Sequence, residues 1–201
     1  MNLHAVPPIP PRLRLRIILV RHGKPAIALA PRTSHRGFAD YINAYEAAGL
    51  DPANLPPGEL QNLVRGLAAV FTSARPRAHQ SARALAPHAE LIVNALFAEA
   101  PLASPHIPLL RMRVQKWAVM ARILWHVGYN PRIENYRRAR RRAIQAADIL
   151  IARARGEGAT ALVAHGYFNA MIGWQLRRRG FRRIGTHRVC YWNAVIYEME
   201  V

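Results

Sequence analysis

Cysteine is almost absent from this chain of 201 residues, and its scarcity excludes two ways of stabilising a protein. The one cysteine, Cys190, cannot form a disulfide within the chain, and it cannot build a zinc site of paired cysteines. A chain without disulfides is typical of a reducing compartment. We therefore expect a cytoplasmic protein that depends on a hydrophobic core.

Long hydrophobic runs are missing as well. The most apolar helical candidate, residues 114–129, carries Lys116, Arg122 and His126, so it falls short of the ~20 apolar residues that a membrane span requires. The first 16 residues are rich in proline and arginine and lack the apolar centre of a signal peptide. The sequence thus predicts a soluble chain with no membrane span.

Acidic residues are few and lysine is nearly absent, whereas arginine is abundant. Aspartate and glutamate number 11 against 29 lysines and arginines, a formal net charge of +18, and only Lys24 and Lys116 are lysines. Such a surplus attracts polyanions, among them nucleic acid, anionic lipid headgroups and phosphorylated substrates. Because alanine and proline are abundant too, a compositional bias of the genome explains the surplus equally well.

Alternating strand and helix patterns organise the rest of the chain. A hydrophobic content of 51% indicates one globular domain over 14–201, preceded by a proline- and arginine-rich arm at 1–13. We expect strands at 15–20, 69–73, 89–94, 159–166 and 190–200, and helices at 36–48, 59–68, 76–86, 111–128, 134–154 and 168–179. This alternation predicts an α/β fold, a three-layer sandwich whose mostly parallel central sheet is flanked by helices.

Two of these predicted strands have the same pair of residues, a histidine and a glycine, at or just after their end. "ILVRHGKP" and "ALVAHGYF" both run from apolar residues into a histidine and a glycine, and "FTSARPRAHQSA" lies between them in the sequence. Because open parallel sheets bind ligands at the carboxyl ends of their strands, the side chains should meet at one edge. We expect Arg21, His22, His165 and one of Arg75 or Arg77 to converge there.

These three segments resemble the motifs of the histidine phosphatase superfamily, which has the phosphoglycerate mutase-like fold. "FTSARPRAHQSA" is similar to the family pattern Ser-Ser-Pro-x-x-Arg-Ala-x-x-Thr-Ala, and the order and spacing match over residues 14–200. Since a true phosphoglycerate mutase has extra insertions and a longer chain, the resemblance implies the phosphatase branch of the family.

The resemblance also implies a role for each residue of the site. His22 matches the nucleophile that forms a covalent phosphohistidine, a step that suits a neutral imidazole. Arg21 and Arg77 match the phosphate-binding arginines, and His165 matches the second histidine, which stabilises the transferring phosphoryl group. Arg75 is the rival of Arg77, with solvent exposure as its simpler interpretation.

A carboxyl group is needed to protonate the leaving group. Glu99 corresponds to the family's acid position, and an apolar setting would favour its protonated form. The chain departs from the family pattern at Lys24, which is either a phosphate contact or a surface lysine, and at Ala28, where the family often has Asn or Ser. Thr33 and Ser34 are candidates to replace that polar contact.

A helical insertion at about 104–131 stands where the family places its lid. Trp117 and Trp125, eight residues apart, are expected to pack in the core or in a dimer interface rather than to bind a ligand. Asn169 is expected to support the site through hydrogen bonds.

The sequence therefore predicts a metal-independent phosphatase that hydrolyses a small phosphomonoester through phosphohistidine and needs no cofactor. A basic domain that binds nucleic acid or another phosphorylated ligand without turnover is the alternative, supported by "RRARRR" (137–142) and "LRRRGFRR" (176–183). No recognised nucleic-acid motif accompanies those runs. A degenerate family member that binds without catalysis and a homodimer are also left open.

Overall fold

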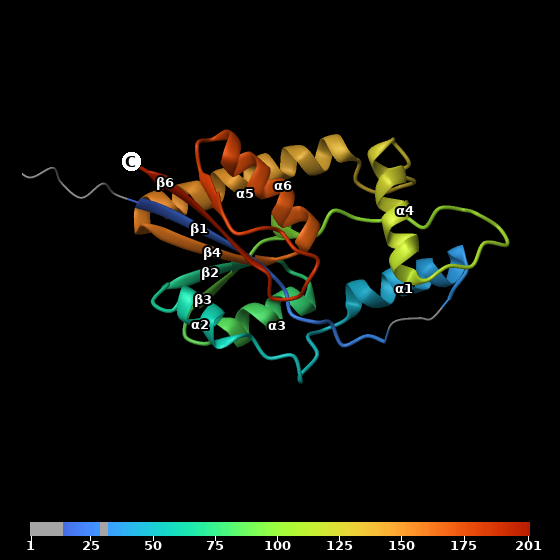
Figure 1. Ribbon diagram of the computed structural model, residues 1–201, viewed down its shortest axis with the longest axis horizontal. Helices are drawn as coiled ribbons and strands as arrows, with labels where there is room; N and C mark the ends of the chain where they lie inside the picture. The colour runs from blue at the N-terminus through green and yellow to red at the C-terminus, as the bar shows by residue number, and fades with distance from the viewer. Residues whose placement is uncertain (1–13, 29–31) are drawn as a thin grey trace, which may run out of the picture.

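A central sheet with helices on both faces forms the body of the protein (Figure 1). The computed structural model describes residues 14–28 and 32–201. The arm expected at 1–13 lies outside the described residues. The α/β class predicted from the sequence is confirmed.

The strands and helices begin and end close to the positions expected from the sequence. The strands are β1 (Arg14–Arg21), β2 (Ala69–Thr72), β3 (Glu90–Val93), β4 (Ala159–Ala164), β5 (Arg182–Ile184) and β6 (Ala194–Glu200). The helices are α1 (His35–Ala47), α2 (Gly58–Val64), α3 (Pro76–Leu85), the 3-10 turn η1 (Ala95–Phe97), α4 (Val114–His126), α5 (Tyr136–Glu157) and α6 (Gly166–Arg178).

The sheet has the strand order β3-β2-β4-β1-β6-β5. β3, β2, β4 and β1 run parallel to one another, whereas β6 runs antiparallel to both β1 and β5. β5 was not expected from its short arginine-rich sequence. β6 begins four residues later than expected, and just before it Trp192 has a left-handed backbone with φ of 59°.

Each face of the sheet is covered by its own pair of helices. α5 and α6 pack on one face through a core that includes Leu19, Leu150 and Ile172. α2 and α3 cover the other face, where Val20 and Leu85 lie in a second core. The sandwich thus has the three layers that the sequence predicts. The alanine stripe of α5 is buried as expected, although Tyr136 at its start is 37% exposed.

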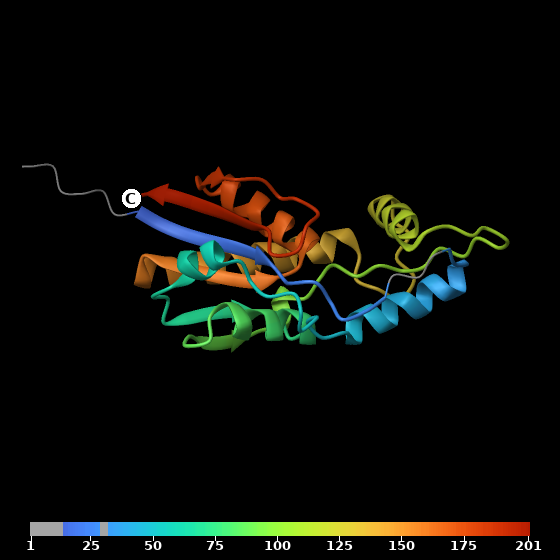
Figure 2. The same ribbon diagram turned by 60° about the horizontal axis from the view of Figure 1, so that its bottom comes forward.

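α1 and α4 lie beyond the carboxyl ends of the parallel strands, beside the body of the sandwich (Figure 2). Phe38 of α1 stacks on Trp117 of α4 with ring centroids 5.8 Å apart, and the Trp117 indole donates a hydrogen bond to the Thr33 carbonyl. Trp125 is also buried and donates to the Glu134 carbonyl. Both tryptophans therefore pack inside the chain, as expected.

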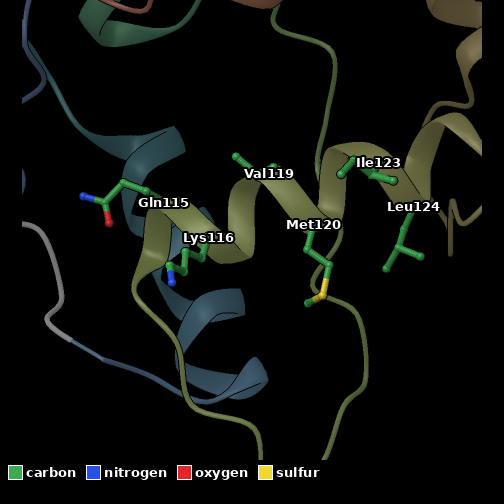
Figure 3. A pocket seen from close by; sticks show the side chains of 6 residues that line it. All are labelled: Gln115, Lys116, Val119, Met120, Ile123 and Leu124. Atoms are coloured by element: carbon green, nitrogen blue, oxygen red, sulfur yellow. The ribbon is translucent and has the colours of Figure 1, made fainter.

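The opposite side of α4 is apolar and open to solvent. Six side chains line a hollow along this helix, and Val119 and Ile123 are 61% and 59% exposed (Figure 3). Nothing in the structure indicates what covers this face, so the homodimer stays a prediction. Over the described ranges 14–28 and 32–201, no helix is both long and apolar enough to cross a membrane.

Candidate active site

Two neighbouring strands bring the two histidines together. β1 and β4 are parallel and in register, with Arg21 opposite Ala164, so the residues that follow them emerge side by side. The His22 backbone N–H donates to the Ala164 carbonyl at 2.9 Å, and the rings of His22 and His165 are 5.2 Å apart between centroids. The convergence expected from the strand ends is thus present.

The His22 ring is oriented by a backbone carbonyl. Its Nδ1 lies 2.7 Å from the Gly23 oxygen, and since a carbonyl only accepts, Nδ1 carries the proton of the neutral ring. The lone pair is then left on Nε2. Burial of the ring, which is 2% exposed, lowers the pKa of His22 to about 3, with Arg77 and Arg21 acting in the same direction. His22 is therefore a neutral imidazole near neutral pH.

Gly23 is required by close packing. A Cβ at this position would come within 2.5 Å of both Leu50 and Trp192 side-chain atoms. The Gly23 N–H donates to Ser81 Oγ at 2.9 Å, and the Ser81 hydroxyl donates to the Arg77 carbonyl. Behind the site, the Asn169 amide donates to the Val20 carbonyl at 3.0 Å, which is the supporting contact expected of it.

His165 is fully buried between Ser73 and Arg77. Its Nδ1 lies 3.4 Å from Arg77 Nη2, which can only donate, so its Nε2 carries the proton that Ser73 Oγ accepts at 2.9 Å. Burial lowers the pKa of His165 well below its ordinary value, and the neighbouring His22 and arginines lower it further.

Arg21 and Arg77 flank the two histidines. The Nε of each is buried and has no hydrogen-bond partner in the part of the chain that the structure describes. The Arg21 guanidinium lies 4.8 Å over the ring of Tyr191, and that of Arg77 lies 4.5 Å over the ring of Tyr45. Unpartnered buried donors of positive charge next to two neutral histidines make a site for an anion with several acceptor oxygens.

The remaining basic and hydroxyl candidates lie outside this cluster. Arg75 is 46% exposed and pairs with Glu46, whereas Arg77 is fully buried, so Arg77 is the arginine that meets the histidines. Lys24 pairs with Asp51 at 2.9 Å. Ser34 caps α1, and Thr33 forms a backbone bridge to Met112.

Glu99 lies at the first turn of α6, whose N-cap is His165. Its carboxylate accepts N–H bonds from Ala100, Phe168 and Tyr167 at 3.0, 2.9 and 3.3 Å. These donors fix the orientation of the carboxylate beside the first turn of α6. The carboxylate is surrounded by backbone N–H donors, and the charge of Glu99 acts on the nearby Arg122.

Several site residues carry no signal that sequence reasoning had recognised. Tyr45 and Glu46 come from the end of α1, and Tyr191 precedes β6. None of them follows a strand at the carboxyl edge, which is the pattern that identified the others. Within the residues described, no group of three or more His, Cys, Asp or Glu side chains is placed to hold a metal ion.

The fold and the site together define a phosphoglycerate mutase-like α/β protein with a pair of histidines at the carboxyl edge of its sheet. A family model described as histidine phosphatase superfamily (branch 1) matches residues 17–200. The chain therefore belongs to the histidine phosphatase superfamily, as its motifs had indicated.

Solved structures with the same fold are distant in sequence. The product of the open reading frame Rv3214 from Mycobacterium tuberculosis is 18% identical, with a TM-score of 0.58 and 90% of each chain covered. The mycobacterial glucosyl-3-phosphoglycerate phosphatase is 14% identical, with a TM-score of 0.57 and coverage of 92% of this chain and 90% of that one. The phosphoserine phosphatase from Entamoeba histolytica, in complex with 3-phosphoglyceric acid, is 14% identical, with a TM-score of 0.56 and coverage of 90% and 89%. Comparison with curated proteins finds no match.

Proposed function

We propose that this protein is a phosphatase that hydrolyses a small phosphomonoester through a covalent phosphohistidine on His22. The observation that carries the proposal is the His22 ring itself: it is buried and neutral, its Nδ1–H is held by the Gly23 carbonyl, and its Nε2 is left with a lone pair. A nitrogen lone pair of fixed direction is what an in-line attack on phosphorus requires.

The reaction then has two displacements. In the first, His22 Nε2 forms a bond to phosphorus while the bond from phosphorus to the ester oxygen breaks, and the leaving oxygen takes a proton. In the second, water attacks the phosphorus, the P–N bond breaks, and inorganic phosphate leaves. Arg21 and Arg77 are the proposed ligands of the nonbridging oxygens, because each has a buried Nε–H without a partner among the described residues.

Glu99 is the proposed proton donor of the first displacement and the proton acceptor of the second. Its carboxylate is oriented by the N–H groups of Tyr167 and Phe168, two and three residues after His165 in the chain. His165 is proposed to stabilise the transferring phosphoryl group as a neutral N–H donor through Nε2, whose proton is accepted by Ser73 Oγ in the free protein.

The substrate class rests on the family and its neighbours. Two of the similar structures are phosphatases, named for glucosyl-3-phosphoglycerate and for phosphoserine. We extend to this chain only what the two names share, a small organic phosphomonoester. The reaction is proposed to need no metal or other cofactor, and the cytoplasmic location stays a prediction from the sequence.

Release of inorganic phosphate from an aryl phosphate in the presence of a chelator tests the proposal. The parent protein should turn over the ester, and His22→Ala should abolish turnover. His88→Ala, at an exposed histidine of the loop between α3 and β3, is the matched control and should leave turnover unchanged. Turnover that survives His22→Ala would contradict the proposal.

Binding of polyanions without turnover is the second candidate, and one surface feature favours it. Trp174 is 43% exposed, and the guanidinium groups of Arg140 and Arg178 lie 5.3 and 4.8 Å from its ring centroid. Exposed aromatic side chains within a positively charged surface are typical of proteins that bind single-stranded nucleic acid. Salt-sensitive binding of an oligonucleotide that persists in His22→Ala and is lost in Trp174→Ala would support this function.

A further inference from the structure

The carboxyl end of α1 forms hydrogen bonds with Arg77, the buried arginine of the site. The carbonyl groups in the last turn of a helix lack partners within the helix, and here two of them accept from Arg77. Arg77 Nη1 donates to the carbonyl oxygens of Tyr45 at 2.8 Å and Glu46 at 3.4 Å. The Glu46 side chain adds a charged contact, with Oε1 2.9 Å from Arg77 Nη2.

These contacts determine which N–H groups of Arg77 remain for a ligand. A guanidinium has five N–H donors in a fixed plane. Nη1 is held by the two carbonyls, Nη2 by Glu46 with His165 Nδ1 at 3.4 Å, and Nε is buried without a partner among the residues described. Both terminal nitrogens of the guanidinium are therefore bound to α1, and Nε–H is the donor that has no partner among the residues described.

Glu46 is shared with a second arginine. Its Oε2 lies 2.7 Å from Arg75 Nε, and its side chain is 30% exposed, whereas Arg77 is completely buried. Each oxygen of the carboxylate is thus bound by a different guanidinium. Arg75 is held on the solvent side of Glu46, and Arg77 is held on the side of the histidines.

We propose that Glu46 is a positioning residue that sets the orientation of Arg77 and thereby aims its free Nε–H at the phosphoryl group. This inference deepens the proposed function and rests on it for the identity of the ligand. Glu46 acts through Arg77 and has no contact with the reacting atoms.

The inference is testable because the charge of Glu46 and its positioning role predict opposite effects on phosphate binding when Glu46 is removed. Glu46 carries the same sign of charge as phosphate, so its removal should strengthen phosphate binding if charge were its only effect. If Glu46 positions Arg77, its removal should weaken binding, because the guanidinium loses one of the partners that fix its plane.

A double-mutant cycle with inorganic phosphate, measured by titration calorimetry, separates the two effects. Glu46→Ala should weaken phosphate binding by about tenfold to a hundredfold, the effect of losing one charged hydrogen bond. Glu46→Gln retains an oxygen that accepts from Arg77 Nη2, so it should stay within about threefold of the parent. In an Arg77→Lys background, which lacks the planar fork, Glu46→Ala should cause no further weakening.

The control is Asp40→Asn, which removes one negative charge from an exposed position on the same helix and should leave binding unchanged. Tighter phosphate binding by Glu46→Ala, or the same loss in both backgrounds, would overturn the inference. Should Glu46→Ala fail to fold, Glu46→Met has a similar volume, lacks the oxygen, and is expected to behave in the same way.

The failure of the proposed function would be visible in a different measurement. Phosphate binding needs no turnover, so the cycle tests Glu46 even in a protein that hydrolyses nothing. Loss of the proposed function would instead appear as turnover that does not depend on His22. Parallel values of kcat/KM for an aryl phosphate should follow the phosphate affinities across the variants.

Discussion

The buried, neutral state of His22 makes the stability of the protein depend on pH in a way that one substitution should remove. The pKa of His22 falls from 6.5 to about 3 in the folded chain, chiefly through burial. Between these two values the unfolded chain binds a proton that the native chain does not bind. The free energy of unfolding therefore falls as the pH falls from the unfolded pKa toward the folded one.

The magnitude follows from the same shift. One pKa unit corresponds to about 1.36 kcal/mol. Lowering the pH from about 7 to about 5 should therefore reduce the free energy of unfolding by roughly 2 kcal/mol through His22 alone. Because the ring is only 2% exposed, screening by solvent does not reduce this figure. His22→Asn retains an N–H donor for the Gly23 carbonyl but has no titrating ring. Over the same change of pH, its free energy of unfolding should therefore fall by about 2 kcal/mol less than that of the parent.

Urea unfolding at a series of pH values, in buffers without phosphate, measures the difference. His165 is present in both proteins, and burial, the main cause of its lowered pKa, remains in both, so most of its contribution cancels in the comparison. His88→Asn, at an exposed histidine, is the control and should follow the parent. Equal loss of stability in the parent and in His22→Asn would refute the reasoning, because it would mean that the His22 ring titrates alike in the folded and unfolded chains.

Three further substitutions test other parts of the account. Glu99→Gln should reduce kcat by about 10²–10⁴-fold for esters with poor leaving groups and less for aryl phosphates, and an equal loss for both would argue against proton donation. Gly23→Ala should lower the free energy of unfolding by about 1–3 kcal/mol, because the new Cβ would meet Leu50 and Trp192 at 2.5 Å. An unchanged urea midpoint would contradict this, because it would mean that the neighbouring side chains move aside without cost. Trp117→Phe removes one of the two donors to the Thr33 carbonyl, since the Met112 N–H remains, so a loss of about 0.5–1.5 kcal/mol is expected in urea unfolding. No loss would mean that the indole hydrogen bond contributes nothing to stability.

The parts of the site that could be predicted from the sequence are those that follow strands. His22 and His165 come directly after two apolar strands, and parallel strands deliver their ends to one edge, so the sequence pattern alone brings the two residues together. The resemblance had matched Arg77 and left Arg75 as its rival, and the structure places Arg77 against His165. Both arginines stand at the start of α3, and only the packing shows which one is buried against His165.

The parts that could not be predicted depend on how the chain returns to the site. Glu46 and Tyr45 reach Arg77 because α1 ends over α3, and nothing in the periodicity of α1 fixes where that end lies. The polar surroundings of Glu99 come from the backbone of α6, some 70 residues later, as the separation of 69 from Phe168 illustrates. β5 was missed because three arginine-rich residues carry no strand pattern until β6 pairs with them.

Detection of the covalent intermediate tests the central claim most directly. The parent protein is mixed with a phosphomonoester, quenched in alkali, and digested, and the peptide that contains His22 is examined by mass spectrometry. The account predicts a phosphoryl group on His22 that acid removes and alkali spares, and that is absent from His22→Asn. Hydrolysis of the ester by the parent with no phosphoryl group on His22, or with the group on another residue, would contradict it.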